Sequence, residues 1–178
     1  MSVSERSPSV FQAATRRAWR DLPFFLIAGS ILAFDQLTKA VVRNGLALGE
    51  SWPNEDWPVR ILHVTNSGAA FGMLQGQGLF LTITAFIAIG AIAFYYAFPP
   101  LEHGLLRLAL ALQLGGALGN LIDRLRFSEV TDFIHFPSYP AFNVADSSIV
   151  IGLVCVFAFF LFQGRREDTS NDHHTGQQ

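Results

Sequence analysis

Apolar residues along this chain gather into four long blocks that are separated by polar segments. The blocks run approximately over residues 22–42, 79–98, 105–125 and 145–162. A helix that crosses a bilayer needs about 20 mostly apolar residues, and each block comes close to that length. Four such runs in one small chain leave no polar layer to cover them. The pattern therefore predicts an all-α membrane protein with four transmembrane helices.

The longest segment outside these blocks, residues 43–77, has a different pattern. Val59 to Val64 alternates in part between apolar and polar positions and contains β-branched residues, which predicts a short strand. Trp52 and Trp57 flank it, and tryptophan favours the boundary between membrane and water. We expect a small extracytoplasmic β platform on the bilayer surface.

Composition and charge extend this picture. Only 15% of the 178 residues are charged, against roughly 25% in soluble domains. The length suits one domain, which we place at 21–164 between polar tails at 1–20 and 165–178 that are expected to lack fixed structure. Arginines concentrate in both tails, so the positive-inside rule predicts a multi-pass protein with both termini in the cytoplasm and the 43–78 and 126–144 loops outside.

Several other site types are disfavoured. The first block is longer than the apolar region of a cleavable signal peptide and contains Asp35 and Lys39, which favours a retained helix. The single cysteine, Cys155, excludes a disulfide framework. The adjacent His173 and His174 lie in the polar tail and are interpreted as solvated residues. No metal and no cofactor are predicted.

Two carboxylates near the end of the chain are the strongest functional signal. Asp132 and Asp146 each lie at the edge of an apolar run, where a charge is costly and suggests a function. They lie 14 positions apart, and the loop between them contains prolines and can fold back. Two facing carboxylates can carry out acid–base catalysis with water.

Other polar residues lie near the same end of the predicted helices as these two aspartates. Asp35 and Lys39, at i and i+4, are interpreted as an internal ion pair rather than as catalytic groups. Asn143 and Asp146 also fit an N-cap with a first-turn carboxylate. Asn120, Asp123 and Arg124 form a polar face on the third block, and two roles remain open for Asp123: a salt bridge to Arg124 or assistance to the aspartate pair.

Five blocks in order resemble the motifs of lipoprotein signal peptidase, also called signal peptidase II. They are Asp35 to Lys39, Asn66 to Phe71, Gly115 to Arg124, Val130 to Ile134, and Phe142 to Ser147. The resemblance covers roughly residues 22–163. Two departures stand out: Ser128 replaces a glycine, and Thr131 replaces the second valine of a Val-Val-Asp-Phe motif. The loop between the two aspartates is also short for the family.

The resemblance implies an aspartyl protease of the bacterial inner membrane. It would cut the signal peptide from diacylglyceryl-modified prolipoproteins before the lipidated cysteine, with its active site at the outer face. The catalytic pair would be Asp132 and Asp146, and the substrate-binding residues would be Asn66, Asn120, Arg124 and Asn143. Supporting positions would be Asp35, Lys39, Gly68, Asp123 and Ala145. We expect a monomer surrounded by membrane lipid, without nucleic acid.

Two rival functions follow from other protein classes. A small transporter or channel would also contain carboxylates and small residues within the membrane. However, the polar residues here gather at one end of the spans, and the other halves are nearly all apolar. A non-catalytic scaffold with structural ion pairs would tolerate the loss of either Asp132 or Asp146.

Overall fold

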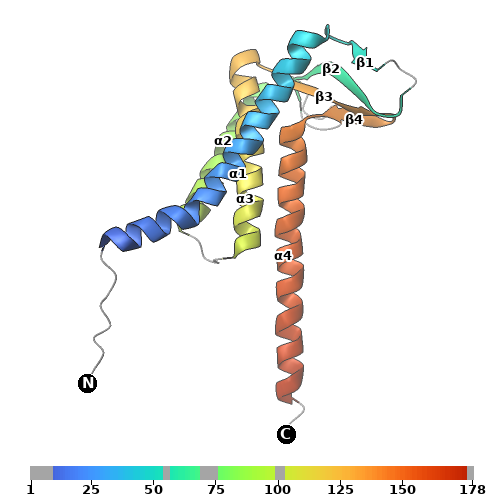
Figure 1. Cartoon of the computed structure of the whole chain (residues 1–178). Coiled ribbons are helices and arrows are strands. Elements are labelled where there is room, and N and C mark those ends of the chain that lie inside the picture. Colours follow the sequence, from blue (N-terminus) through green and yellow to red (C-terminus); the bar gives the residue numbers. More distant parts are fainter. Residues whose placement is uncertain (1–9, 54–56, 69–75, 99–102, 176–178) are drawn as a thin grey trace.

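The computed structural model describes residues 10–53, 57–68, 76–98 and 103–175 of the chain. Four helices form a bundle, and a four-stranded antiparallel sheet covers one end of it (Figure 1). In chain order the elements are α1 (Val10–Gly45), β1 (Ser51–Trp52), β2 (Arg60–Asn66), α2 (Gly78–Ala97), α3 (Gly104–Phe127), β3 (Val130–Phe136), β4 (Tyr139–Phe142) and α4 (Val144–Thr175). The predicted fold class is confirmed.

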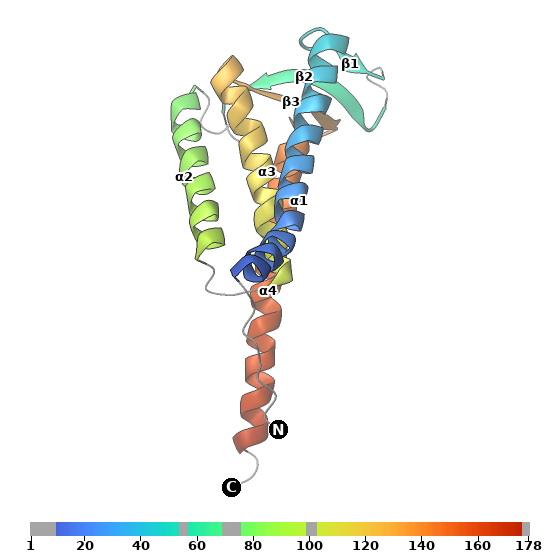
Figure 2. The same ribbon diagram turned by 60° about the vertical axis from the view of Figure 1, so that its left-hand side comes forward.

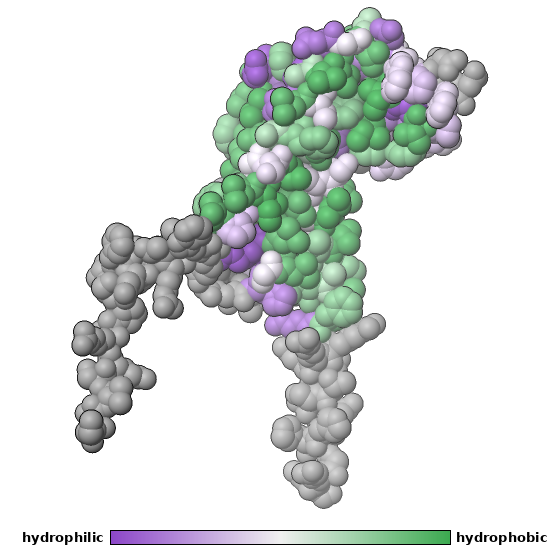
Figure 3. Space-filling model, viewed as in Figure 1, coloured by the Kyte–Doolittle hydropathy of each residue, from purple (hydrophilic) through white to green (hydrophobic). Residues whose placement is uncertain are grey.

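All four helices contain a segment that is long and apolar enough to cross a membrane. These segments are Asp21–Gly45, Gly78–Ala97, Gly104–Phe127 and Val144–Gln163. Their exposed sides carry large apolar residues, and Figure 3 shows a largely hydrophobic surface over the bundle below the more polar sheet end. Lipid rather than water suits such a surface. The four predicted spans match these helices to within a few residues.

The helices extend beyond the predicted spans at both chain ends. Helix α1 begins at Val10 and α4 continues to Thr175, so the prediction that both tails lack fixed structure was wrong for their described parts. The physical reason is cooperativity: residues added to an existing helix need no new nucleus. The start of α1 and the end of α4 lie at the end of the bundle opposite the sheet (Figures 1 and 2).

Helix α3 is the centre of the bundle. It contacts α1, α2 and α4, and 44% of its spanning segment is buried, against 6% for α2. Glycines permit this close packing. A Cβ atom on Gly115 would lie 2.6 Å from the carbonyl oxygen of Ala28 in α1, and one on Gly116 would lie 2.5 Å from the carbonyl oxygen of Ala145 in α4.

The sheet has the strand order β1-β2-β3-β4. Val64 lies opposite Asp132 and Asn66 lies opposite Val130, so the side chains of Asn66 and Asp132 share one face. The β3–β4 hairpin turns tightly between Phe136 and Tyr139, and this fold-back brings Asp146 towards Asp132. The predicted strand within residues 59–64 is confirmed as part of β2.

One departure from the family motifs has a visible backbone role. Ser128 follows the last residue of α3 with a φ of 65°, in the left-handed region, and its N–H donates to the carbonyl oxygen of Arg124 at 2.9 Å. Glycine is the usual residue at this position of a helix end because it lacks a Cβ atom. Serine keeps the same turn into β3, at some cost in strain.

The packing of α3 against α4 generates a stability prediction. We expect Gly116→Ala to lower the free energy of unfolding by about 1–3 kcal/mol, because the added methyl group overlaps Ala145 and Ser148. Gly90→Ala in α2 is the matched control, since a Cβ atom there has no neighbour within 4 Å. Thermal unfolding in detergent measures both. Equal melting temperatures for the two variants would contradict this packing.

Candidate active site

Asp132 lies in β3 and is held by two amide groups. Asn66 of β2 donates from Nδ2 to Asp132 Oδ2 at 2.9 Å, and Asn143 donates from Nδ2 to Asp132 Oδ1 at 2.7 Å. Asn66 is fixed in turn, because its Oδ1 accepts the backbone N–H of Gly68 at 2.9 Å. Both oxygens of this carboxylate, which is only 3% exposed, therefore have donors. The sheet register and the N-terminus of α4 together set its orientation.

Asp146 lies in the first turn of α4 and forms a reciprocal cap with Asn143. The backbone N–H of Asp146 donates to Asn143 Oδ1 at 2.9 Å, and the backbone N–H of Asn143 donates to Asp146 Oδ2 at 3.2 Å. This is the pairing of a capping box, so the predicted N-cap exists. The other carboxylate oxygen, Oδ1, accepts from Asn120 Nδ2 at 2.8 Å. The cap thus fixes the carboxylate as well as the helix start.

Asn143 connects the two aspartates. Its side chain donates to Asp132 and its backbone donates to Asp146, so one buried residue contacts both carboxylates. Asn120 Oδ1 accepts from Asn143 Nδ2 at 3.2 Å, which closes a ring of amides around the pair. The structure therefore brings Asp132 and Asp146 into one polar cluster, together with three predicted asparagines: Asn66, Asn120 and Asn143.

A buried ion cluster lies directly behind this site. Lys39 Nζ is 2.8 Å from Asp35 Oδ2 and 3.5 Å from Asp123 Oδ2, and all three side chains are fully buried. Lys39 also donates to Asn120 Oδ1 at 2.9 Å. The predicted Asp35–Lys39 ion pair is confirmed. It extends across α1 and α3 rather than remaining within one helix.

Each acid of this cluster holds the backbone beside one aspartate of the pair. Asp35 Oδ1 accepts the N–H of Ala145, the residue before Asp146, at 2.9 Å. Asp123 Oδ2 accepts the N–H of Thr131, the residue before Asp132, at 3.1 Å. The two supporting carboxylates thus tie α4 and β3 to the same ammonium group.

Asp123 does not form a salt bridge to Arg124, which was one of the two roles left open for it. Among the described residues, it contacts Lys39, Arg43, Gln36 and the backbone N–H of Thr131 instead. Neighbouring residues on a helix point about 100° apart, so Asp123 faces α1 while Arg124 faces the cavity.

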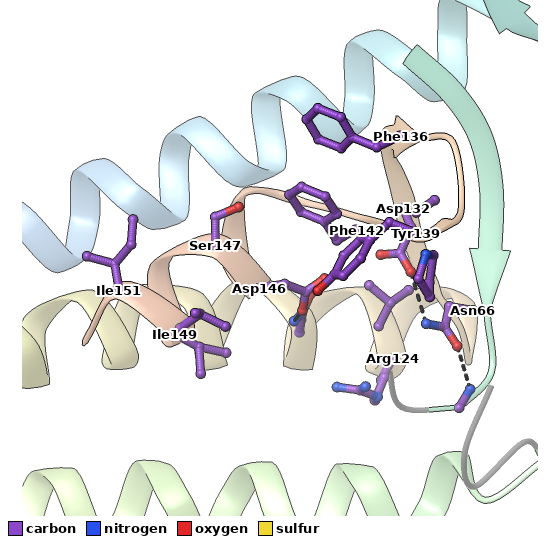
Figure 4. Close-up of a pocket in the computed structure, with 16 residues that line it drawn as sticks. Asn66, Arg124, Asp132, Phe136, Tyr139, Phe142, Asp146, Ser147, Ile149 and Ile151 are labelled. Atoms are coloured by element: carbon purple, nitrogen blue, oxygen red, sulfur yellow. Dashed lines mark hydrogen bonds between the residues drawn. The ribbon is translucent and has the colours of Figure 1, made fainter. Parts of the chain in front are cut away.

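The two aspartates line a cavity of about 730 Å³ between α3, α4 and the sheet (Figure 4). Asn66, Asn120, Arg124 and Gly68 contribute to its polar end. Most of the remaining wall is apolar and comes from the β3–β4 hairpin and α4, with Phe136, Tyr139, Pro140, Ala141, Phe142, Ile149, Val150 and Ile151. Val150 and Ile151 are also more than half exposed on the side of α4, so the wall continues onto the bundle surface.

Burial changes the protonation of Asp132. Desolvation is the main cause that raises the pKa of Asp132, and the charge of Asp146 adds to it, whereas the amide donors of Asn66 and Asn143 and the charge of Lys39 oppose the shift. The net result is a pKa of about 6. A carboxyl group with this pKa is a proton donor or acceptor near neutral pH. Among the described residues, no group of three His, Cys, Asp or Glu side chains could hold a metal ion.

Sequence reasoning missed several residues around the site. Gln36 donates to Asp123 Oδ1 at 3.1 Å and to the carbonyl oxygen of Gly119 at 3.0 Å, and Arg43 reaches Thr131 Oγ1 at 3.0 Å. The aromatic wall of the hairpin was also not foreseen. Asp35 and Gln36 are adjacent in α1, and their sequence positions did not indicate that both side chains would reach α3. The motif block that begins at Asn66 continues into residues 69–71, which lie outside the described residues.

The ion cluster generates a prediction on stability. We expect Lys39→Met to lower the free energy of unfolding by about 3–5 kcal/mol, because two buried carboxylates lose their shared cation. The control is Arg107→Met, which removes a partly exposed pair with Asp21 and should cost only about 1 kcal/mol or less. Denaturant unfolding compares the two variants. A Lys39→Met protein as stable as the control would contradict this assignment.

Comparison with known proteins identifies relatives of this chain. A family model described as Signal peptidase (SPase) II matches residues 27–162. A lipoprotein signal peptidase of Moorella thermoacetica is 46% identical over 134 residues, covering 75% of this chain and 89% of that protein. A lipoprotein signal peptidase of Bacillus pumilus is 40% identical over 151 residues, covering 83% and 97%.

A solved structure has the same fold. It is a bacterial membrane enzyme determined by the in meso method at 2.3 Å resolution, with a TM-score of 0.74 and 33% identity, covering 84% of this chain and 90% of that one. A second such structure, at 1.9 Å resolution, has a TM-score of 0.71. The matched region contains all four spanning segments for most of their length and every residue of the aspartate cluster. The chain therefore belongs to the signal peptidase II family.

Proposed function

We propose that the protein is a membrane aspartyl endopeptidase that removes the signal peptide from diacylglyceryl-modified prolipoproteins, cutting before the lipidated cysteine. The observation that carries the proposal is the single residue Asn143, which hydrogen-bonds both Asp132 and Asp146 at the wall of a largely apolar cavity. Membership of the signal peptidase II family supports the substrate class.

The proposed roles of the two carboxylates follow from their surroundings. Asp146 lies at the N-terminus of α4, where the helix dipole favours a negative charge, so it serves as the base. Asp132, with its pKa raised to about 6, carries the shared proton and serves as the acid. No third group is needed for the reaction, because a pair of carboxyl groups in different protonation states supplies both functions.

Hydrolysis then proceeds in two steps. Asp146 takes a proton from a water molecule as its oxygen attacks the scissile carbonyl, and Asp132 donates its proton to the oxygen that gains charge. The tetrahedral intermediate collapses when Asp146 passes the proton it took from water to the amine nitrogen of the lipidated cysteine, and the C–N bond breaks. One hydroxyl group of the intermediate returns a proton to Asp132, so the pair again shares one proton. The signal peptide leaves with a new carboxyl group, which then ionises in water.

The cavity provides substrate contacts of two kinds. Arg124 presents guanidinium donors that can hold a backbone carbonyl of the peptide, and Asn66 lies at the same polar end. The apolar wall that reaches the exposed side of α4 suits acyl chains arriving from the bilayer. The substrate therefore enters sideways from the membrane, and the lipid anchor fixes which bond reaches the aspartates.

The proposal includes an orientation and a cellular setting. Arginine-rich ends favour cytoplasmic termini in the bacterial inner membrane, and the start of α1 and the end of α4 lie opposite the sheet (Figure 1). This orientation puts the cavity at the outer face, where a lipoprotein precursor emerges. We propose a monomer that acts on prolipoproteins within membrane lipid, without nucleic acid.

The transporter alternative is less well supported. Among the described residues, the buried polar and charged side chains gather at the sheet end, whereas the core at the opposite end consists of apolar residues such as Phe24, Ala28 and Ile92. A transport path needs polar groups that continue across the membrane. The arrangement suits chemistry at one surface.

We predict that Asp132→Asn and Asp146→Asn each abolish cleavage and leave the fold in place. Each amide keeps the size of the carboxyl group but removes its proton-transfer function, and rate losses of about a thousandfold or more are expected. The measurement is cleavage of a diacylglyceryl-modified prolipoprotein by purified protein in detergent, with melting temperatures as the folding control. Full activity in either variant would exclude the aspartate pair as the catalyst.

We also predict a pH profile that reports Asp132. Because the acid must be protonated, kcat/KM should fall as the pH rises through the pKa of Asp132, about 6. Asn66→Ala removes a donor that lowers this pKa, so the falling limb should move to higher pH in the variant. Rates measured between pH 4 and 9 test this. A limb that moves to lower pH would refute the role given to Asp132.

A further inference from the structure

Thr131 is held at three atoms, although it does not line the cavity. Its N–H donates to Asp123 Oδ2 at 3.1 Å, its carbonyl oxygen accepts from Asn143 Nδ2 at 3.4 Å, and its Oγ1 accepts from Arg43 Nη1 at 3.0 Å. The side chain is buried, and neighbouring side chains on a strand point to opposite faces. Thr131 is therefore fixed from the side of β3 that faces away from the cavity.

Arg43 is built into this contact from the last turn of α1. Its Nη1 also lies 3.5 Å from Asp123 Oδ2, and its guanidinium carbon is 4.7 Å from the centre of the Phe127 ring. The side chain is 22% exposed, so it is largely covered. One guanidinium group thus joins the ends of α1 and α3 to the first residues of β3.

Arg43, Asp123 and Thr131 form a closed network in which each residue contacts the other two. Arg43 contacts Asp123 and Thr131, and Asp123 in turn accepts the backbone N–H of Thr131. The hydroxyl and the amide of a single residue are therefore fixed by two side chains of opposite charge. Because Asp132 is the next residue along β3, its Cα position depends on this attachment.

We propose that Arg43 and Thr131 are positioning residues. The Arg43–Thr131 hydrogen bond fixes β3 so that the carboxyl group of Asp132 lies beside the peptide bond that is cut. The inference rests on the proposed function, since it assigns these residues to the same reaction. They touch neither the substrate nor the reacting atoms. Their contribution is orientation, because small displacements of a catalytic group cost rate.

The test uses an exchange that removes only the hydroxyl. Thr131→Val has nearly the same shape, and we expect it to lower kcat by about threefold to tenfold while KM stays within about twofold. Thr131→Ser retains Oγ and should recover most of the rate. The matched control is Thr65→Val, since Thr65 lies opposite Thr131 in β2 and is exposed. Thermal unfolding of all variants separates a loss of folded protein from a loss of rate.

A second arm tests the partner directly. In an Arg43→Met background the hydroxyl has lost its donor, so Thr131→Val should cause no further loss of kcat. A Thr131→Val protein with the wild-type kcat, or a Thr65→Val protein with the same loss, would overturn the inference alone. A loss of kcat on Thr131→Val that is equally large with and without Arg43 would also overturn the inference. A folded wild type that cleaves no prolipoprotein would overturn the proposed function and this inference with it.

Discussion

A buried ammonium group is the constraint on which the site depends. Lys39 lies between Asp35 and Asp123 with no exposure, and a charge in such a place is tolerated only when it is paired and hydrogen-bonded. The two acids each accept one further N–H, from Ala145 and Thr131. These residues precede the two aspartates of the cavity. The position of one cation therefore relates the start of α4 to the strand β3, and with them Asp146 to Asp132.

The aspartate pair illustrates how polar groups are used in an apolar setting. Asp132 and Asp146 are kept close by donors rather than by a cation in direct contact, and Asn143 supplies a donor to each. Amide donors lower the pKa of a carboxyl group, but less than a cation in direct contact would, so burial can still raise the pKa of Asp132. The raised pKa of Asp132 is the consequence of burial next to a second acid. A site of this kind suits the proton transfer that we propose better than it suits a permanent charge.

The packing of the helices also keeps the ion cluster next to the two aspartates. Gly119 of α3 lies against the Asp35 carboxylate, and Gly116 lies against the first turn of α4. Larger residues at these positions would push α1 and α4 away from α3 and separate the ion cluster from the aspartates. Small residues in α3 are therefore a condition for the arrangement of the aspartate pair as well as for the bundle. At the opposite end of the same helix, α3 buries apolar side chains of its own, such as Leu106 and Ala109.

The sequence by itself determined the spans, the strand in β2 and the candidate residues, because hydropathy and helix periodicity are local properties. The ion pair of Asp35 and Lys39 and the cap of Asn143 were also predictable, since their partners lie within one turn. Only the tertiary structure decided that Asp123 binds Lys39 and Arg43 instead of Arg124, and that Thr131, a departure from the motif, receives a bond from Arg43. Those contacts join residues 80 or more positions apart. They depend on how α1, α3 and β3 meet in space, which no local pattern encodes.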